Sequence, residues 1–362
     1  MKKKLRVAIL FGGKSAEHEI SLISARNIVA AMDKNKYDIV AIGIDKQGCW
    51  HLDEGAKLLI GGDKTKVEFR NSTNATAIMP GNSATPMVPR SGAAKLADID
   101  VVFPILHGPF GEDGTVQGLL KLANLPFVGA GVLGSAVGMD KDVMKRLLRD
   151  AGICIGKFMA FERSDEINFA KVKRTLGMPL FVKPANLGSS VGISKVTKFS
   201  QFSAALTEAF RYDNKIVIEE FILGREIECS VLGNDHPIAS LPGEIVVNHD
   251  FYSYDAKYID AQGSRLEIPA KLPAKLIREI RQIAIQVYKA VCCEGMGRID
   301  FFVQANGRVV VNEINTIPGF TRISMYPKMW EASGIPYNKL IDRLISLALE
   351  RFRREQRLRV SK

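Results

Sequence analysis

Cysteine is scarce in this sequence of 362 residues, and the few cysteines form no recognisable pattern. The five, Cys49, Cys154, Cys229, Cys292 and Cys293, are scattered, odd in number and without the CxxC spacing of zinc sites. The sequence therefore indicates neither a disulfide framework nor a zinc site. A reducing environment fits best, so we expect a cytoplasmic protein.

The sequence also lacks a hydrophobic segment suited to a membrane. The longest stretch without charge, residues 122–139, contains Asn124, Pro126 and four glycines, whereas a spanning helix needs about 20 mostly apolar residues. The apolar run at residues 7–11 is shorter than the core of a signal peptide, which takes roughly 7 to 15 residues. We expect no membrane segment, and residues 7–11 are better explained as a buried strand.

Two common nucleotide-binding motifs are absent from the first glycine-rich turn, FGGKS at residues 11–15. A P-loop would need a glycine at Ala8, and no GxGxxG pattern is present there. The turn leads instead to Glu17, close to the start of a predicted helix. A carboxylate in this position can simply stabilise the helix dipole, which position alone favours, or it can hold a substrate ammonium group at the edge of a parallel sheet.

Basic residues are concentrated at the two ends of the chain. Of the net charge of +11, residues 1–6 contribute +4 and residues 351–362 contribute +5, which leaves +2 for everything between. The tails lack interleaved aromatic residues, and no nucleic-acid recognition motif is present. We therefore expect two solvated tails and no nucleic-acid partner, with a tail-dependent nucleic-acid binder as the alternative.

The remaining composition, 46% hydrophobic and 25% charged, is typical of a globular protein of two or three domains. Strands predicted at 5–11, 37–44 and 101–106 alternate with helices at 19–32 and 115–123, which favours parallel βαβ units. Residues 53–98 have no clear period and are interpreted as an insertion or as irregular strands lying outside the sheet.

A glycine-rich link at 129–138 is expected to lead into a compact α+β unit. From residue 215 the pattern becomes strand-rich, and one of its predicted strands covers residues 238–245. Helices at 275–291 and 337–353 flank these strands.

The segment LHGPFGEDGTVQG at 106–118 follows a predicted strand. His107 can lie at the ligand-binding edge of the sheet, or the segment can be a loop in which Asp113 caps the next helix. The sequence leaves both interpretations open.

The segment VKPANLGSSVG at 182–192 places a lysine at the end of an apolar strand and two serines in a glycine-rich loop. Successive backbone N–H groups and the hydroxyls of Ser189 and Ser190 can surround phosphate oxygens, while Lys183 supplies positive charge. Phosphate binding is favoured here over a plain hairpin loop.

Acidic and amide side chains interrupt two apolar segments, RIDFF at 298–302 and VNEINTIPGF at 311–320. On adjacent antiparallel strands, Glu313 and Asn315 point to one face and Asp300 can lie opposite them. Buried carboxylates without partners are costly, and oxygen ligands suit Mg²⁺ better than zinc. We predict a Mg²⁺ site, with a structural salt-bridge cluster around Arg298 as the alternative.

A long polar segment with four aromatic residues, NHDFYSYDAKYIDAQG, occupies positions 248–263. Long loops are usually functional or disordered, and the aromatic residues argue against disorder. We interpret the segment as a lid over a reactive intermediate.

Eight sequence blocks, taken together, resemble the D-alanine-D-alanine ligases of the ATP-grasp superfamily. They occur in the family's order: GGKSAEHEISL, HGPFGEDGTVQG, MDKDVMK, VKPANLGSSVG, EEFILGREIE, DFYSYDAKYID, GRIDFF and NEINTIPGFTRISMYP. The resemblance implies an α/β chain with the ATP-grasp fold. An N-terminal Rossmann-like parallel-sheet domain, residues 1–138, would precede two α+β subdomains, residues 139–214 and 215–362, that sandwich ATP. It also implies a homodimer.

The resemblance further implies which residues bind ATP and metal. Phosphates would be contacted by Lys141, Lys183, Ser189, Ser190 and Lys257. The adenine would lie against Glu219, Glu220, Phe221 and Ile222, and the ribose against Glu226. Two Mg²⁺ ions, replaceable by Mn²⁺, would be held by Asp300, Glu313 and Asn315.

The implied substrates are two molecules of D-alanine. Glu17 would hold the ammonium group of the first in a site lined by His107, and Ser324 would meet the carboxylate of the second. Arg298 and the backbone N–H of Gly319 would face the developing oxyanion, while Ser189 and Tyr258 would bond across to Glu17.

In the implied reaction the first D-alanine carboxylate attacks the γ-phosphate of ATP, and the second D-alanine's amine attacks the resulting acyl phosphate. The product, D-alanyl-D-alanine, is a peptidoglycan precursor.

Two positions bear on specificity. Many relatives carry Lys or Gln followed by Trp at Glu220 and Phe221, which predicts a modest change in ATP affinity. Tyr258 is typical of dipeptide rather than depsipeptide synthesis, so Tyr258→Phe should raise ester formation from D-lactate. Another carboxylate-amine ligase and a non-catalytic nucleotide-binding protein remain the alternatives.

Overall fold

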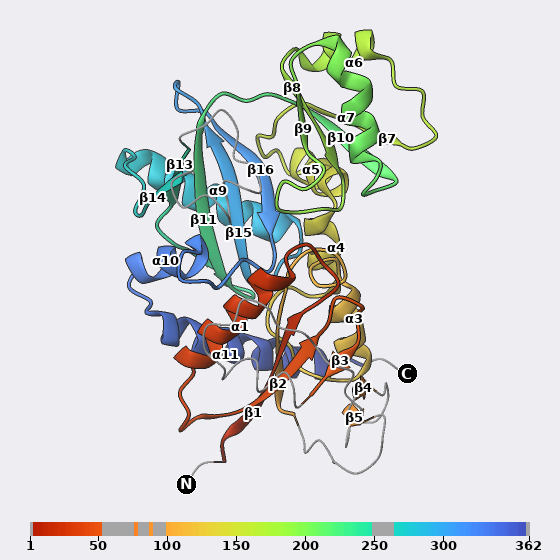
Figure 1. Cartoon of the computed structure of the whole chain (residues 1–362). Coiled ribbons are helices and arrows are strands. Elements are labelled where there is room, and N and C mark those ends of the chain that lie inside the picture. The colour runs from red at the N-terminus through yellow and green to blue at the C-terminus, as the bar shows by residue number, and fades with distance from the viewer. Residues whose placement is uncertain (1–2, 53–75, 79–86, 90–98, 248–263, 360–362) are drawn as a thin grey trace.

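The computed structural model describes residues 3–52, 76–78, 87–89, 99–247 and 264–359. The predicted lid, 248–263, lies outside the described residues, as does most of the predicted insertion. Three sheets organise the described part of the chain (Figure 1). A short hairpin of β4 (Thr76–Ile78) and β5 (Met87–Pro89) stands apart from them.

The first sheet contains the parallel strands that the sequence predicts. Its order is β3 (Trp50–His51), β2 (Tyr37–Ile44), β1 (Leu5–Gly12) and β6 (Val101–Leu106). β1 is parallel to both β2 and β6. Val7, Ile9 and Phe11 face one hydrophobic core, while Ala8 and Leu10 face another. Both faces of the sheet are therefore buried, as is usual for parallel strands.

Helices from both ends of the chain cover this sheet. α1 (His18–Ala31) and α11 (Tyr337–Gln356) share the core of the first face, and α3 (Thr115–Leu122) packs on the second. Because α11 belongs to the C-terminal third of the chain, the first core joins distant parts of the sequence.

The second sheet is antiparallel. Its order is β7 (Phe158–Glu162), β10 (Lys215–Glu220), β8 (Leu180–Pro184) and β9 (Ser194–Val196). α6 (Phe169–Leu176) and α7 (Phe202–Ala209), the latter preceded by a 3₁₀ turn at Phe199–Gln201, pack against it through a separate core.

The third sheet carries most of the C-terminal strands. Its order is β14 (Ser264–Glu267), β13 (Gly243–Val247), β11 (Arg225–Gly233), β15 (Gly295–Val303) and β16 (Val309–Asn315), with β12 (Ile238–Ala239) beside β11. α9 (Ala274–Ala290) and α5 (Lys141–Asp150) contribute to its core. α10 (Met325–Ala332) precedes α11.

Two predictions about this region are wrong. The strand expected at 238–245 is two strands, β12 and β13, because Pro242 between them cannot donate to a ladder. The link expected at 129–138 contains a helix, α4 (Val132–Met139). Its glycines permit close packing, since a Cβ on Gly134 would lie 2.6 Å from the Cys292 carbonyl oxygen and one on Gly138 2.7 Å from Thr316 Cγ2.

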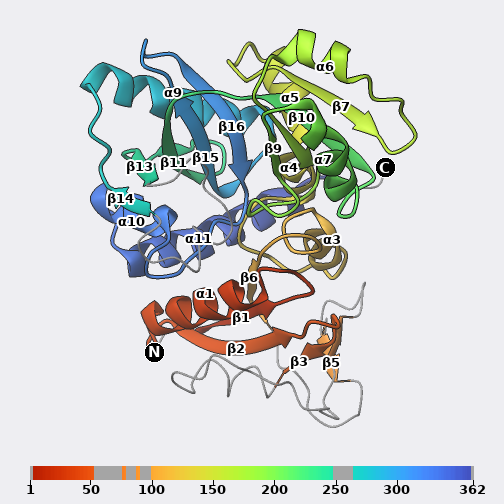
Figure 2. The ribbon, with the colours of Figure 1, turned by 45° about the horizontal axis from the view of Figure 1, so that its top comes forward.

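The second and third sheets lie side by side beyond the first, and α4 lies between them and the first sheet (Figures 1 and 2). The three sheets with their helices therefore meet in one region of the molecule, where the candidate site described below lies. Within the described ranges, no helix is long and apolar enough to cross a membrane.

Candidate active site

A cavity of about 840 Å³ lies between the units. Its volume is in the range of small-molecule sites, roughly 300 to 1,000 Å³. Many residues predicted from the sequence line it: Glu17, His107, Lys141, Ser189, Arg298, Glu313, Asn315, Gly319 and Ser324. Tyr258 and Lys257 lie outside the described residues, and the remaining candidates are not among the residues that line the cavity.

Glu17 is the N-cap residue of α1, but its carboxylate points to another partner. Its side chain makes no capping hydrogen bond, and its carboxylate instead accepts a hydrogen bond from the Ser189 hydroxyl. Ser189 and Ser190 hold φ angles of 54° and 60°, a left-handed conformation uncommon for serine. The loop backbone therefore turns the Ser189 hydroxyl toward Glu17 across the cavity, which favours a ligand-binding carboxylate over a dipole effect alone.

His107 lies at the end of β6, on the same side of the cavity as Glu17. Its Nδ1 is 3.1 Å from the Ile317 carbonyl oxygen and 4.0 Å from Glu112 Oε1. Burial opposes its protonation, but the carboxylates of Glu112 and Glu17 raise the pKa of His107 above its usual value. The structure thus favours the ligand-edge placement of His107, whose ring contacts the Ile317 carbonyl oxygen.

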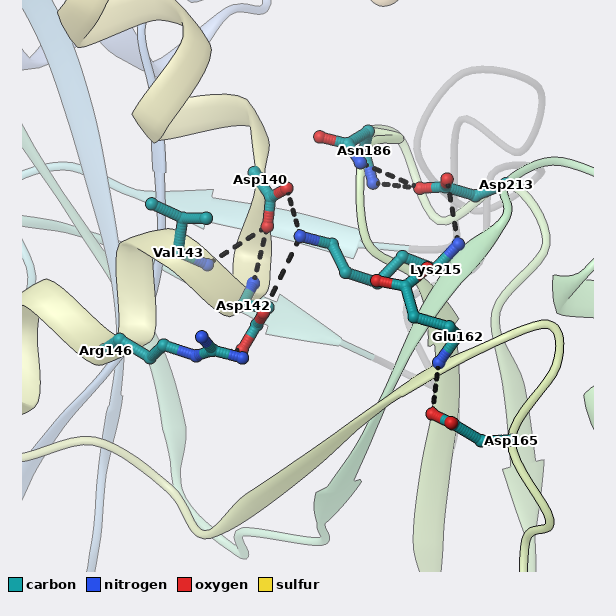
Figure 3. A network of polar contacts seen from close by, with 9 residues as sticks. All are labelled: Asp140, Asp142, Val143, Arg146, Glu162, Asp165, Asn186, Asp213 and Lys215. Atoms are coloured by element: carbon teal, nitrogen blue, oxygen red, sulfur yellow. Dashed lines mark hydrogen bonds and ion pairs between the residues drawn. The ribbon is translucent and has the colours of Figure 1, made fainter.

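A network of polar contacts fixes the start of the serine loop (Figure 3). Asp213 accepts hydrogen bonds from the backbone N–H and the side-chain amide of Asn186, at 2.7 and 3.0 Å. Lys215 Nζ lies 2.5 Å from Asp140 Oδ2 and 3.6 Å from Asp142 Oδ2, at the first turn of α5. Figure 3 shows these contacts joining α5, β10 and the loop, so Lys141 and the loop are held by one framework.

Three lysines and two glutamates form a largely buried cluster of charges at the site. Glu219 is buried between two ammonium groups: Lys183 Nζ is 2.7 Å from its Oε2 and Lys145 Nζ 3.2 Å from its Oε1. Lys141 Nζ donates to the Leu187 carbonyl oxygen at 2.6 Å and lies 3.7 Å from Glu313 Oε2.

The electrostatics of this group favour an incoming anion. Burial works against the charge on Lys183, but Glu219 and Glu313 raise its pKa above the usual value. Burial lowers the pKa of Lys141, and Glu313 compensates only in part. Burial also disfavours ionised Glu219, yet Lys145 and Lys183 lower its pKa. Phosphate oxygens would supply the negative charge that the three lysines still lack.

The stretch predicted to contact adenine runs from the end of β10 into the following turn. The buried Glu219 carboxylate is engaged by lysines, and Glu220 Oε1 accepts a hydrogen bond from the Lys157 backbone at 2.8 Å. The Phe221 ring lies under Lys195 Nζ at 4.8 Å, and Glu226 follows on β11. The carboxylates of Glu219 and Glu220 are therefore both engaged within the protein.

The predicted metal ligands lie on one face of two neighbouring strands. Asp300 of β15 is directly opposite Glu313 of β16, and Arg298 is opposite Asn315. Asn315 Oδ1 is buried without a hydrogen-bond partner, which is consistent with a role as a metal ligand. Among the described residues, no group of three or more His, Cys, Asp or Glu is arranged to hold a metal by itself. Two carboxylates and an amide suit Mg²⁺, which takes further ligands from phosphates and water.

Arg298 forms ion pairs with neighbouring carboxylates, so the salt-bridge cluster that the sequence offered as an alternative to a metal site is present in part. Its Nε and Nη2 donate to the two carboxylate oxygens of Asp300 at 2.8 Å each, and its Nε lies 2.9 Å from Glu228 Oε2. Burial opposes the charge on Arg298, but Asp300 and Glu228 raise its pKa well above the usual value. The guanidinium is therefore a permanent positive charge at the cavity wall.

Gly319 and Ser324 form a tight turn at the far wall. Ser324 Oγ accepts hydrogen bonds from the Thr321 backbone N–H at 2.9 Å, and a Cβ on Gly319 would lie 2.8 Å from that oxygen. A side chain at position 319 would require the Ser324 hydroxyl to move, whereas glycine lets the two residues approach closely at the cavity wall.

Sequence reasoning missed three residues of the site: Glu112, Lys145 and Glu228. Lys145 follows Lys141 by four positions, and this spacing on a helix places both on one face. Glu112 and Glu228 carry no such signal, because their roles depend on which strands and loops become neighbours.

Comparison with known proteins identifies the family to which this chain is similar. Family models described as "D-ala D-ala ligase N-terminus" and "D-ala D-ala ligase C-terminus" match residues 6–130 and 147–346. A D-alanine--D-alanine ligase of Shouchella clausii (strain KSM-K16) is 54% identical over 361 residues, covering 99% of this chain and 98% of the relative.

Solved structures agree as well. The D-alanine-D-alanine ligase of Coxiella burnetii aligns with a TM-score of 0.85 and 43% identity, over 98% of this chain and 96% of that one. The Bacillus anthracis D-alanine--D-alanine ligase complexed with ATP aligns with a TM-score of 0.73 and 30% identity, over 97% and 99% of the two chains.

Proposed function

The chain belongs to the D-alanine-D-alanine ligase family, and from this premise we propose how its residues divide the work of the ligation. It is an ATP-dependent ligase with the ATP-grasp fold, and it joins two D-alanine molecules for peptidoglycan synthesis. The observation that carries the assignment of residues is that Glu17, Lys141, Ser189 and Arg298 line the same cavity.

The first half of the reaction places a carboxylate against the γ-phosphate. Glu17, fixed by Ser189, holds the ammonium group of the first D-alanine, and His107 closes that end of the site. Lys141 and Lys183 neutralise the phosphates as the carboxylate attacks. Tyr258 and Lys257, from the lid predicted over residues 248–263, would complete the enclosure and so exclude water from the acyl phosphate.

The second half forms the peptide bond. Ser324 binds the carboxylate of the second D-alanine, whose amine attacks the acyl phosphate. Arg298 and the backbone N–H of Gly319 stabilise the oxyanion of the tetrahedral intermediate, and phosphate leaves. Because Arg298 is held in ion pairs, its charge is in place before the reaction begins.

Asp300, Glu313 and Asn315 are the residues that would hold two Mg²⁺ ions, or Mn²⁺ in their place. The orphaned Asn315 Oδ1 and the facing pair of carboxylates support this. When bound, the ions would supply positive charge beside the nucleotide phosphates.

The larger organisation is part of the same proposal. Residues 1–138 would form one domain, and residues 139–214 and 215–362 would form the two subdomains that enclose ATP. The nucleotide would lie between Ser190 on one side and Ile222 and Glu226 on the other. We further propose a homodimer, which light scattering would test, and a cytoplasmic location, which suits ATP as co-substrate.

The test is phosphate release from ATP and Mg²⁺ in the presence of D-alanine, of L-alanine, and of D-alanine with D-lactate, with products identified by mass spectrometry. We expect release only with D-alanine, and D-alanyl-D-alanine as the product even when D-lactate competes. ATP binding without turnover on any of these substrates would overturn the assignment of the substrate residues.

A further inference from the structure

Three strands of the third sheet carry a row of carboxylates across one face. Glu228 of β11 is directly opposite Asp300 of β15, which is directly opposite Glu313 of β16. Two residues along on the same face, the register places Ser230, Arg298 and Asn315 in a second row. Arg298 is thus the cation within a group of three carboxylates, two of which are proposed metal ligands.

Glu228 is the member of this group without a role so far. Its side chain is 7% exposed, it lines the cavity, and its Oε2 lies 2.9 Å from Arg298 Nε. Asp300 contacts the same Nε and also Nη2, each at 2.8 Å. Arg298 is therefore shared between a carboxylate proposed to hold metal and one that is not.

Asp300 contacts the Arg298 guanidinium and is also a proposed metal ligand, so the guanidinium and the metal ion would compete for its carboxylate oxygens. A carboxylate bonded to a guanidinium through both oxygens has less of its charge and fewer lone pairs to offer a metal ion. A second carboxylate on the opposite side of Arg298 draws part of that interaction away from Asp300 and also keeps the guanidinium oriented at the cavity wall.

We propose that Glu228 is a positioning residue that holds Arg298 and thereby releases Asp300 for the metal ion. The inference rests on the proposed function in that it takes Asp300 as a metal ligand. It concerns metal affinity rather than turnover, so its test does not depend on ligase activity.

The experiment measures Mn²⁺ binding in the presence of ADP by electron paramagnetic resonance, on the full-length chain. Glu228→Gln keeps the size of the side chain and removes its charge, and we expect about tenfold weaker Mn²⁺ binding, the effect of one charged hydrogen bond. Glu228→Asp keeps the charge but shortens the side chain, so it should lose most of the same affinity.

The matched control is Glu244→Gln. Glu244 is also buried in this sheet and bonded to an arginine, with Arg225 Nε 2.7 Å from its Oε1, but it does not line the cavity. We expect Mn²⁺ binding close to that of the unchanged protein. A loss equal to that of Glu228→Gln would overturn the proposal, because any broken ion pair in the sheet would then suffice.

A double-variant cycle separates positioning from simple charge. On an Arg298→Gln background, Glu228→Gln should weaken Mn²⁺ binding less than about threefold, because the residue through which Glu228 acts is gone. An equal loss on both backgrounds would mean that Glu228 acts only as a distant negative charge. Unchanged affinity in Glu228→Gln would overturn the proposal outright. If Mn²⁺ binds normally but no dipeptide forms, the proposed function fails instead.

Discussion

Replacing Lys145 by methionine would test the buried charge cluster behind the phosphate site. The Lys145 side chain is 2% exposed, and its Nζ is held 3.2 Å from Glu219 Oε1 and 3.4 Å from the Asn312 carbonyl oxygen. Methionine fills similar space without charge. Breaking a buried ion pair costs about 3 to 5 kcal/mol. Because Glu219 keeps Lys183 on its other oxygen, we expect a cost below that range, about 2 kcal/mol.

Native-state hydrogen exchange of the central strand β10 measures this cost locally. A loss of about 2 kcal/mol corresponds to exchange roughly 30-fold faster at the amides of Ile216–Ile218. Glu219→Gln should be more damaging, because it leaves two buried ammonium groups facing a neutral amide. The double variant should exchange more slowly than Glu219→Gln alone, since it removes one of those charges.

Additive effects of the two substitutions would refute the reasoning, because residues of one ion-pair cluster must be coupled. Lys289→Met, at a lysine near the end of α9 that takes part in none of these contacts, serves as the control and should leave β10 exchange unchanged.

Three further predictions concern the cavity and its frame. Ser189→Ala removes the hydroxyl that donates to Glu17, and kcat/KM for D-alanine should fall roughly 10- to 100-fold with folding unchanged; an unaltered rate of phosphate release would contradict that role. Because folding raises the pKa of His107, protonated His107 stabilises the fold below pH 6.5, its ordinary pKa, and this stabilisation is lost as the pH rises through the folded-state pKa. His107→Gln should therefore flatten the decline of Tm above pH 6.5, as measured by calorimetry. Parallel curves of Tm against pH for the two proteins would contradict this prediction. Arg351 Nη2 donates a hydrogen bond to the Phe127 carbonyl oxygen at 2.8 Å, and Arg351→Met removes this donor. The free energy of unfolding, measured by urea denaturation followed by circular dichroism, should fall by about 2 to 4 kcal/mol. A change below about 0.5 kcal/mol would show that the contact is dispensable.

Periodicity predicted the elements whose burial is regular. The apolar run at 5–11 is β1, and the alternation around Asp300 and Glu313 placed these two carboxylates opposite each other, as the register confirms. In both cases the side-chain pattern along a single strand carries the information.

Packing decided what periodicity could not. α4 is read as a link because glycines hide its helical pattern, although those glycines are what permits its contact with Cys292 and Thr316. Glu228 pairs with Arg298 from 70 positions away, through a strand register that only the folded sheet defines. Neither contact has a local signature in the sequence.

The placement of α11 has a consequence for how the chain folds during its synthesis. This helix, Tyr337–Gln356, supplies Leu340, Leu344 and Ile345 to the same core as Val7 and Ile9 of β1. A ribosome makes the strands of the first sheet, which end at Leu106, long before it makes α11, so one face of that sheet stays partly uncovered until α11 has been synthesised. While α11 is still missing, the exposed apolar face of the first sheet makes the nascent chain prone to aggregation.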